Sequence, residues 1–79
     1  MPDRVKEIER DIASLREEEK EYSAKWKAEK DLINRIQQNK IDIEQLGFEA
    51  ERAEREGNYA RVAEIRYSLI NNKEQENAA

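Results

Sequence analysis

The 79-residue chain contains no cysteine and no histidine, and it has only two glycines and one proline. Without cysteine there can be neither a disulfide nor a thiolate metal site. Carboxylates are abundant, but none has a histidine or cysteine beside it that could tune it for acid–base chemistry. The two glycines, Gly47 and Gly57, cannot form a phosphate-cradling loop, so any nucleotide site would belong to another part of a longer protein. These absences predict a chain that is not an enzyme and holds no cofactor or metal itself.

Apolar residues are also scarce, at 37% of the chain against 43% charged residues. A compact core usually draws on about 45–50% apolar residues, so the chain lacks the material for one. No apolar run approaches the roughly 18 residues of a membrane span, and Met1-Pro2-Asp3 does not begin a signal peptide. A cytoplasmic protein is therefore expected. The net charge of −4 is modest and mixed in sign, which gives no reason to expect nucleic acid or a membrane as a partner.

What the chain does contain is Glu, Lys and Arg interleaved with Ala, Ile and Leu, the composition of long helices. A heptad seam advances from Val5 to Ala50 in steps of three and four residues without a slip. It passes through Glu19, Glu29, Lys40 and Gly47, and its ten other positions are apolar or aromatic: Val5, Ile8, Ile12, Leu15, Tyr22, Trp26, Ile33, Ile36, Ile43 and Ala50. The pattern predicts one continuous helix packed along a seam.

Residues suited to helix ends give the expected boundaries. Asp3 can cap a helix start, and Gly57 tolerates the left-handed conformation that ends helices. Asn58 can then cap a second helix that starts at Tyr59. We expect a helix over about 3–56, a turn at 57–58 and a shorter helix over about 59–74, which the short turn forces to fold back. The predicted fold is all-α, a long helix plus a shorter antiparallel helix forming a coiled-coil hairpin, with residues 1–79 as one unit.

Facing residues in such a hairpin have numbers that add to about 115. The expected facing pairs are Val62 with Ala53, Ile65 with Ala50, and Leu69 with Leu46. The shorter helix would then reach back only as far as about residue 38 of the long helix, so the seam from Val5 to Ile36 has no partner. The chain is therefore expected to be a piece of something larger, and the isolated piece is expected to self-associate. Gly47 interrupts the seam, and a close approach of the returning helix could explain it.

Two charged segments allow more than one interpretation. Lys25-Trp26-Lys27 with Lys30 mixes basic and aromatic residues as nucleic-acid binders do, yet Trp26 falls on the seam and packing is the favoured reading. The charged run 51–56 at the hairpin tip is ordinary surface or a docking site, with the surface reading only modestly favoured. By contrast, the run Glu17-Glu18-Glu19 indicates a solvated helix face.

Several segments together resemble the middle domain of ClpB-type disaggregases, chaperones of the AAA+ class. They are Ala24-Lys25-Trp26-Lys27-Ala28-Glu29-Lys30, Ile43-Glu44-Gln45, Gly57-Asn58-Tyr59-Ala60-Arg61 and Ala63-Glu64-Ile65-Arg66-Tyr67. The resemblance runs from about Asp3 to Tyr67. Beyond it, Ser68-Leu69-Ile70-Asn71-Asn72 departs from the glycine and proline usual in the family. The family's preceding helix would cover the unpartnered seam.

The resemblance implies a regulatory arm on an ATPase homohexamer that disaggregates stress-denatured proteins. ATP would bind in the AAA+ modules, and the arm would contact those modules and neighbouring middle domains. The hairpin tip would dock a DnaK-type chaperone. Tyr67 and Lys40 would make regulatory contacts. The candidate docking residues at the tip are Glu51, Arg52, Arg55, Glu56, Asn58 and Arg61.

Other classes of module remain open. The segment from Phe48 to Arg66 is also similar to the short UVR-type helical hairpin of excision-repair and protease-adaptor proteins. That similarity leaves the long helix around Trp26 unexplained. A generic structural coiled coil, or an RNA-binding helical arm, is a third reading, and the mixed charge argues against RNA.

Overall fold

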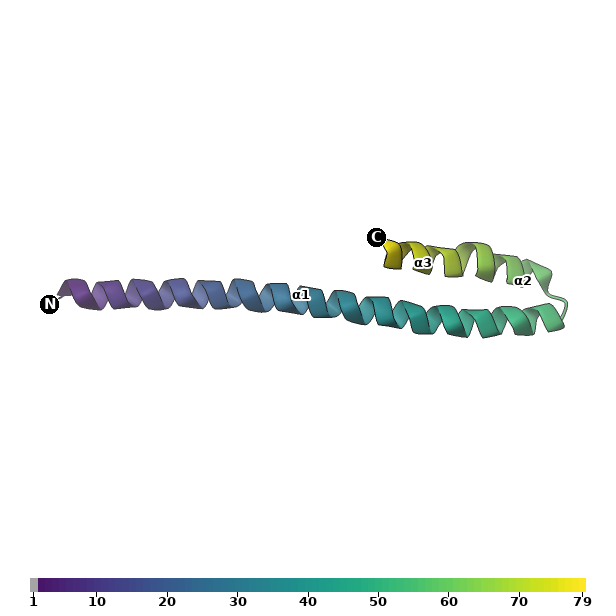
Figure 1. Ribbon diagram of the computed structural model, residues 1–79, viewed down its shortest axis with the longest axis horizontal. Helices are drawn as coiled ribbons and strands as arrows, with labels where there is room; N and C mark the ends of the chain where they lie inside the picture. Colours follow the sequence, from purple (N-terminus) through teal and green to yellow (C-terminus); the bar gives the residue numbers. More distant parts are fainter. Residues whose placement is uncertain (1) are drawn as a thin grey trace. The chain divides into compact units, whose positions relative to one another are not determined.

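The computed structural model describes residues 2–79, which form two helical segments and a short turn (Figure 1). Helix α1 spans Pro2–Arg55. The returning helix consists of α2 (Tyr59–Glu64), the π-helical segment η1 (Ile65–Leu69) and α3 (Ile70–Ala78). No strand occurs within residues 2–79. The predicted all-α hairpin is confirmed, although the returning helix continues to Ala78 rather than ending near residue 74.

Two units divide the chain, Met1–Leu32 and Ile33–Ala79. In the first, α1 is a single helix that starts at Pro2, one residue before the expected cap, so Asp3 lies in its first turn. A carboxylate there is favourable because the helix dipole places partial positive charge at the N-terminus. The second unit is the hairpin itself.

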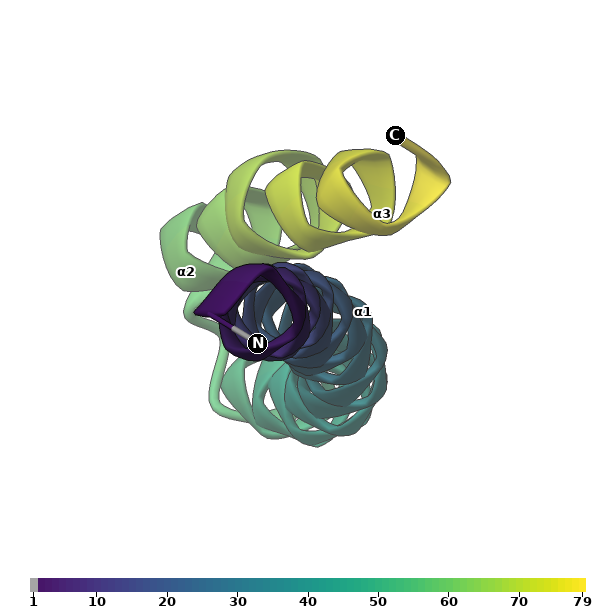
Figure 2. The ribbon, with the colours of Figure 1, turned by 90° about the vertical axis from the view of Figure 1, so that its left-hand side faces the viewer.

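The hairpin core is small and sits near the turn. Figures 1 and 2 show α2, η1 and α3 running back along one side of the C-terminal part of α1. The buried apolar residues are Ala50 and Ala53 on α1 and Val62 and Ile65 on the returning helix, with Ile65 0% exposed. These four belong to the pairs expected to face each other. The Lys73–Asp42 ion pair has residue numbers that add to 115, so the expected alignment also holds far from the turn.

The turn provides hydrogen-bond partners for backbone groups that are left unpaired at the end of α1 and the start of α2. Gly57 has φ +75°, the left-handed region in which a side chain is strained. The Asn58 N–H donates to the Ala53 carbonyl (2.8 Å) and the Gly57 N–H to the Glu54 carbonyl (3.1 Å), the bonds of a Schellman motif. The Asn58 side chain then accepts from the Arg61 N–H at 3.2 Å and caps α2. The helix therefore reverses within three residues.

The π turn at Ile65–Leu69 rotates the inward face of the returning helix. The Ile70 N–H donates to the Ile65 carbonyl, five residues back. Up to this point Val62, Ile65 and Leu69 point inward, and beyond it the half-buried residues are Ile70, Lys73 and Asn77. Uninterrupted α-helical spacing would turn residues 72 and 76 inward instead, and both are exposed. The extra residue thus selects which polar side chains face α1.

Three expectations about the seam need correction. Regular helical spacing predicts that Arg66 shares the inward face of the returning helix with Val62, Ile65 and Leu69, but Arg66 is exposed and pairs with Glu54 at 3.2 Å. Lys40 is exposed as well, and Asn39, about 100° away around the helix, takes the buried place. An amide can satisfy its hydrogen bonds inside the hairpin, whereas an ammonium group there would lose its hydration. A Cβ added at Gly47 would meet nothing within 4 Å, so no close approach explains that glycine.

The two glycines therefore predict opposite effects of alanine. Gly47→Ala should stabilise the hairpin by about 1 kcal/mol, because it raises helix propensity without a clash. Gly57→Ala should destabilise it by about 1–2 kcal/mol, because the left-handed conformation strains a Cβ. Urea unfolding followed by circular dichroism measures both. Equal signs for the two substitutions would contradict this account of the turn.

Candidate functional site

The end of the hairpin forms a polar hollow to which both helices contribute. Its lining comprises Glu49, Arg52, Ala53, Glu56, Asn58 and Arg61. Four of the six predicted tip residues are therefore brought together: Arg52, Glu56, Asn58 and Arg61. The other two, Glu51 and Arg55, lie nearby in sequence and are exposed. The tip is thus a concave, charged surface built around the turn.

Arg61 is the most firmly held of the predicted residues. Its guanidinium donates to the Glu49 carboxylate with N–O distances of 2.6 and 3.0 Å, and it pairs with Glu64 at 3.2 Å. The hydrogen bonds that Arg61 donates to Glu49 and then to Glu64 raise the pKa of Arg61. Arg52 pairs with Glu56 at 3.2 Å along α1. These charges are largely engaged with one another, so they shape the hollow.

Glu49 was not among the predicted tip residues. It lies across the hairpin from Arg61 and accepts both of that side chain's strongest contacts. The expected facing numbers of about 115 place residue 54 opposite Arg61, and Glu49 lies about one and a half turns further along α1. The pairing rule alone therefore points to Glu54, and the reach of the long arginine side chain to Glu49 could not be predicted from it.

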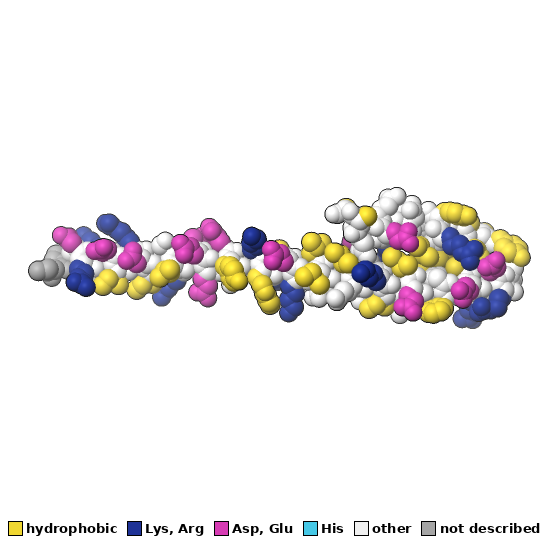
Figure 3. Space-filling model, viewed as in Figure 1, with side chains coloured by type: hydrophobic (Ala, Val, Ile, Leu, Met, Phe, Trp, Pro, Cys, Tyr) yellow, Lys and Arg dark blue, Asp and Glu magenta, His cyan; other side chains and the backbone are white. Residues whose placement is uncertain are grey.

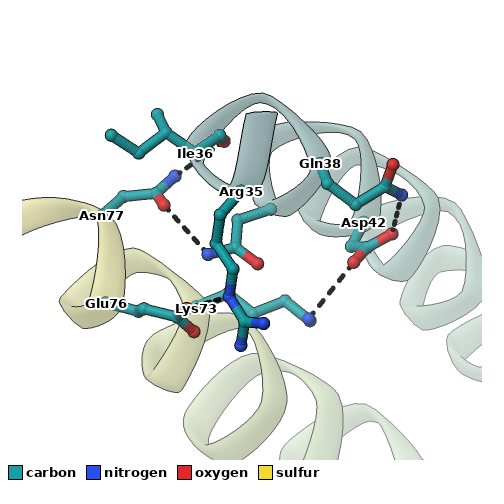
Figure 4. Close-up of polar contacts among 8 residues, drawn as sticks. Arg35, Ile36, Gln38, Asp42, Lys73, Glu76 and Asn77 are labelled. Carbon is teal, nitrogen blue, oxygen red and sulfur yellow. Dashed lines mark hydrogen bonds and ion pairs between the residues drawn. The ribbon is translucent and has the colours of Figure 1, made fainter. Parts of the chain in front are cut away.

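A second polar cluster joins α1 to α3 away from the tip, and we call it the polar clamp: Arg35, Ile36, Gln38, Asn39, Asp42, Lys73, Glu76 and Asn77 (Figure 4). Asn39 is 3% exposed and donates to the Asn77 side-chain oxygen at 2.9 Å. Asn77 in turn donates to the Ile36 carbonyl at 3.2 Å. Arg35 pairs with Glu76, and Lys73 with Asp42 at 3.2 Å. Because α3 has no buried residue, these polar contacts hold it.

The carboxylates of the polar clamp are stabilised in their charged form. Hydrogen bonds from Gln38 and then Lys73 lower the pKa of Asp42. The hydrogen bond from Arg35 lowers the pKa of Glu76 and raises the pKa of Arg35 itself. Charge is thus part of what fixes α3 on α1.

The predicted regulatory residues are both at the surface. Tyr67 is 79% exposed and lies within the π segment, pointing away from the core as helical spacing predicts. Lys40 is exposed on α1. Each is available for contact with another surface.

The first unit carries a separate apolar surface, which we call the α1 stripe: Val5, Ile8, Ile12, Leu15, Tyr22, Trp26 and Leu32, all exposed. Figure 3 shows hydrophobic side chains uncovered along this part of the helix. Lys30 lies over the Trp26 ring, 5.2 Å from its centroid. Tyr22, Ser23, Trp26 and Lys27 line a shallow hollow on this stretch.

Within residues 2–79, no group of three or more acidic residues is arranged to hold a metal ion. None of the helices in this range has the length and hydropathy needed to cross a bilayer. What the described residues present is a helical hairpin with two contact surfaces, a polar tip and an apolar stripe.

The sequence of the chain is similar to those of several known proteins. The chain is 60% identical over 74 residues to the chaperone protein ClpB of Porphyromonas gingivalis, which covers 94% of this chain and 9% of that protein. It is 57% identical over 63 residues to ClpB of Bacteroides thetaiotaomicron, covering 80% of this chain and 7% of that protein. It is 49% identical over 67 residues to the probable chaperone protein ClpB 1 of Chlorobaculum tepidum, covering 85% of this chain and 15% of that protein. No protein-family model and no solved structure matches the chain.

The chain is therefore homologous, over most of its length, to a short segment of ClpB chaperones. The resemblance drawn from the sequence alone is confirmed. Because the chain spans less than a sixth of each of these relatives, the activity and partners of the whole protein are a matter for proposal.

Acid should loosen the hairpin through the polar clamp. Asp42 and Glu76 have folded-state pKa values below their unfolded ones. Their stabilisation is therefore complete above the ordinary carboxyl pKa of about 4 and is lost as the pH falls through the folded-state values. Asp42→Asn/Glu76→Gln should lower the unfolding midpoint at neutral pH, and the gap to the unsubstituted chain should narrow as the pH approaches about 2.

The control is Glu17→Gln, which removes an exposed carboxylate from the first unit. Its melting curve should follow that of the unsubstituted chain at every pH. A gap for the double variant that is constant from neutral to acidic pH would show that the two carboxylates do not stabilise α3 by charge.

Proposed function

We propose that this chain is the regulatory coiled-coil arm of a ClpB-type ATP-dependent chaperone that disaggregates stress-denatured proteins in the cytoplasm. The observation that carries the proposal is 60% identity over 74 residues to a ClpB chaperone. ATP binding and hydrolysis belong to AAA+ modules elsewhere in such a protein. The arm itself contributes contact surfaces and no catalytic group.

The hairpin tip is the proposed docking site for a DnaK-type chaperone. The tip residues have two different roles in this proposal, one structural and one in recognition. Arg61 and Asn58 hold the turn and its hollow in shape, since each is bonded within the hairpin. Glu51 and Arg55 are exposed and enter none of the ion pairs found among the described residues. A charged partner surface can therefore neutralise them without dismantling the turn.

Control of the ATPase hexamer is assigned to the side of the hairpin that carries Tyr67. This tyrosine is nearly fully exposed on the helix face opposite the core, so its removal leaves the hairpin packing intact. A large exposed aromatic is well suited to packing against a second surface of the hexamer, either an AAA+ module or a neighbouring arm. Lys40, which is exposed on α1, is the second proposed regulatory contact.

Charge reversal at the tip tests docking. Arg55→Glu should weaken binding of a DnaK-type chaperone by about tenfold, because an attractive contact becomes repulsive. Titration calorimetry with the purified chaperone measures the dissociation constant. Glu17→Lys, an equally large charge change in the first unit, should leave it within about twofold, the range of a distant surface change. Unmeasurable binding by the unsubstituted chain, with the hairpin folded, would refute the docking proposal.

Substitution of Tyr67 tests regulation. Tyr67→Asp should leave the stability of the isolated chain within about 0.5 kcal/mol of its original value, because the side chain is exposed. In a full-length ClpB-type protein containing this segment, the same change should raise the basal ATPase rate by disrupting a repressive contact. An unchanged ATPase rate would remove Tyr67 from the regulatory site, and a destabilised chain would mean that Tyr67 packs within the hairpin.

A further inference from the structure

Three pairs of adjacent residues on the returning helix correspond to the three places where it meets α1 beyond Ile65. The pairs are Leu69-Ile70, Asn72-Lys73 and Glu76-Asn77. With the π turn present, the second member of each pair is half-buried against α1, and of the first members only Leu69 is. Without the π turn, regular helical spacing from Ile65 would bring the first member of each pair inward instead.

At the middle place the partner on α1 is Asp42. Lys73 donates to its carboxylate at 3.2 Å (Figure 4). The preceding residue, Asn72, carries an amide group whose N–H bonds a carboxylate can also accept. Either member of the pair is therefore able to satisfy Asp42.

At the place farthest from the turn the partner is Asn39. This side chain is 3% exposed, so its amide needs a hydrogen-bond acceptor within the hairpin. It donates to the Asn77 side-chain oxygen at 2.9 Å. The preceding residue, Glu76, offers a carboxylate that accepts the same bond. Asn39 already contributes to the lowered pKa of Glu76, after the larger contribution of Arg35, so the two side chains lie close together.

Nearest the turn the pair is aliphatic. Leu69 and Ile70 are both half-buried, so they share one inward place. Leucine and isoleucine have the same number of carbon atoms and bury similar apolar areas. An exchange between them therefore costs little packing energy.

The forces that hold α3 in its present orientation are weak. No residue of α3 is buried. The side chains of the Lys73–Asp42 ion pair are 32% and 30% exposed, and water screens such pairs. The bond from Asn77 to the Ile36 carbonyl at 3.2 Å favours this orientation. The π turn opposes it, because π-helical backbone is rare and less favourable than α-helix.

We propose that the returning helix switches between two settings on α1 by forming or losing the π turn. In the π setting the second member of each pair faces α1, and in the α setting the first member does. The change rotates α3 by about 100° in place. It does not slide α3 along α1, so Asn39 has an acceptor in both settings. Val62, Ile65 and the turn keep their positions.

The switch connects Tyr67 to the far part of the hairpin. Tyr67 lies inside the segment that changes, and its side chain is 79% exposed. A surface that binds Tyr67 better in one setting therefore also shifts α3 toward that setting, and exchanges Lys73 for Asn72 at the contact with α1. The switch is a property of the hairpin alone, and only its use in regulation rests on the function proposed above.

Nuclear magnetic resonance relaxation dispersion on the 79-residue chain tests the switch, because helix rearrangements of this kind occur in microseconds to milliseconds. Backbone amides of residues 65–78 and the Asn39 side-chain amide should show exchange, whereas amides of residues 59–64 should not. Deletion of Ser68, an exposed residue of the π segment, leaves the second member of each pair at regular α-helical spacing. This deletion should abolish the exchange.

A pair of neighbouring leucine substitutions tests the α setting. Asn71 and Asn72 are both exposed in the π setting, and only residue 72 turns inward in the α setting. Asn72→Leu should therefore raise the population of the α setting about tenfold, because a large apolar side chain becomes buried there. Asn71→Leu is the matched control and should leave the population unchanged.

Three results would overturn the proposal. Exchange that persists after deletion of Ser68 would mean that α3 frays and does not switch. Equal effects of leucine at positions 71 and 72 would show that residue 72 has no inward setting. An absence of exchange in both the unsubstituted chain and Asn72→Leu would leave the hairpin with the π setting alone. The leucine comparison does not depend on how the deletion variant folds, and none of these results bears on docking of another chaperone.

Discussion

The packing of Ile65 against α1 is the contact on which the rest of the hairpin depends. It is the one large side chain among the described residues that is completely buried, and its neighbours in the core are mostly small. Ala50 and Ala53 present only methyl groups, so the returning helix can approach α1 closely enough to enclose the isoleucine. Because Ile65 lies only a few residues after the turn, the turn has to be short for this side chain to face Ala50 and Ala53. The left-handed Gly57 and the Asn58 cap reverse the chain within three residues and satisfy backbone groups at both helix ends.

Beyond Ile65 the hairpin changes its means of attachment from apolar packing to polar contacts. The π turn begins at this residue and shifts the inward face by one position, so that Lys73 and Asn77 face α1 in place of two exposed residues. Asn39 and Asn77 satisfy each other, and Lys73 finds Asp42. Polar contacts of this kind add little net stability but penalise misalignment, because a shifted register would leave a buried amide unpaired. The clamp therefore sets the register, and the apolar contacts near the turn supply most of the stability.

The sequence predicted the elements of the fold well and the details of their contact poorly. Heptad spacing and the Gly57-Asn58 pair carry local information, so the two helices and their reversal could be read directly. The inward placement of Asn39 rather than Lys40 depends on what lies across the hairpin. The π turn also depends on contacts across the hairpin. No residue type in Ile65–Leu69 distinguishes a π turn from an α-helix, so the sequence alone predicts uniform α-helical spacing. The continuation of α3 to Ala78 follows from clamp contacts that join residues far apart in the chain.

The candidate site shows the same division between local and distant information. In the sequence, the tip is an undifferentiated run of alternating charges. In the folded hairpin those charges separate into two sets. Arg61 is tied to carboxylates on both helices, and its exchange for another residue would alter the shape of the hollow as well as its charge. Arg55 and Glu51 have no such structural tie among the described residues, so their charges can be used for recognition without cost to the fold. A substitution at Arg55 or Glu51 therefore changes binding without changing the fold. A substitution at Arg61 would distort the turn as well, so its effect on binding could not be separated from its effect on the structure.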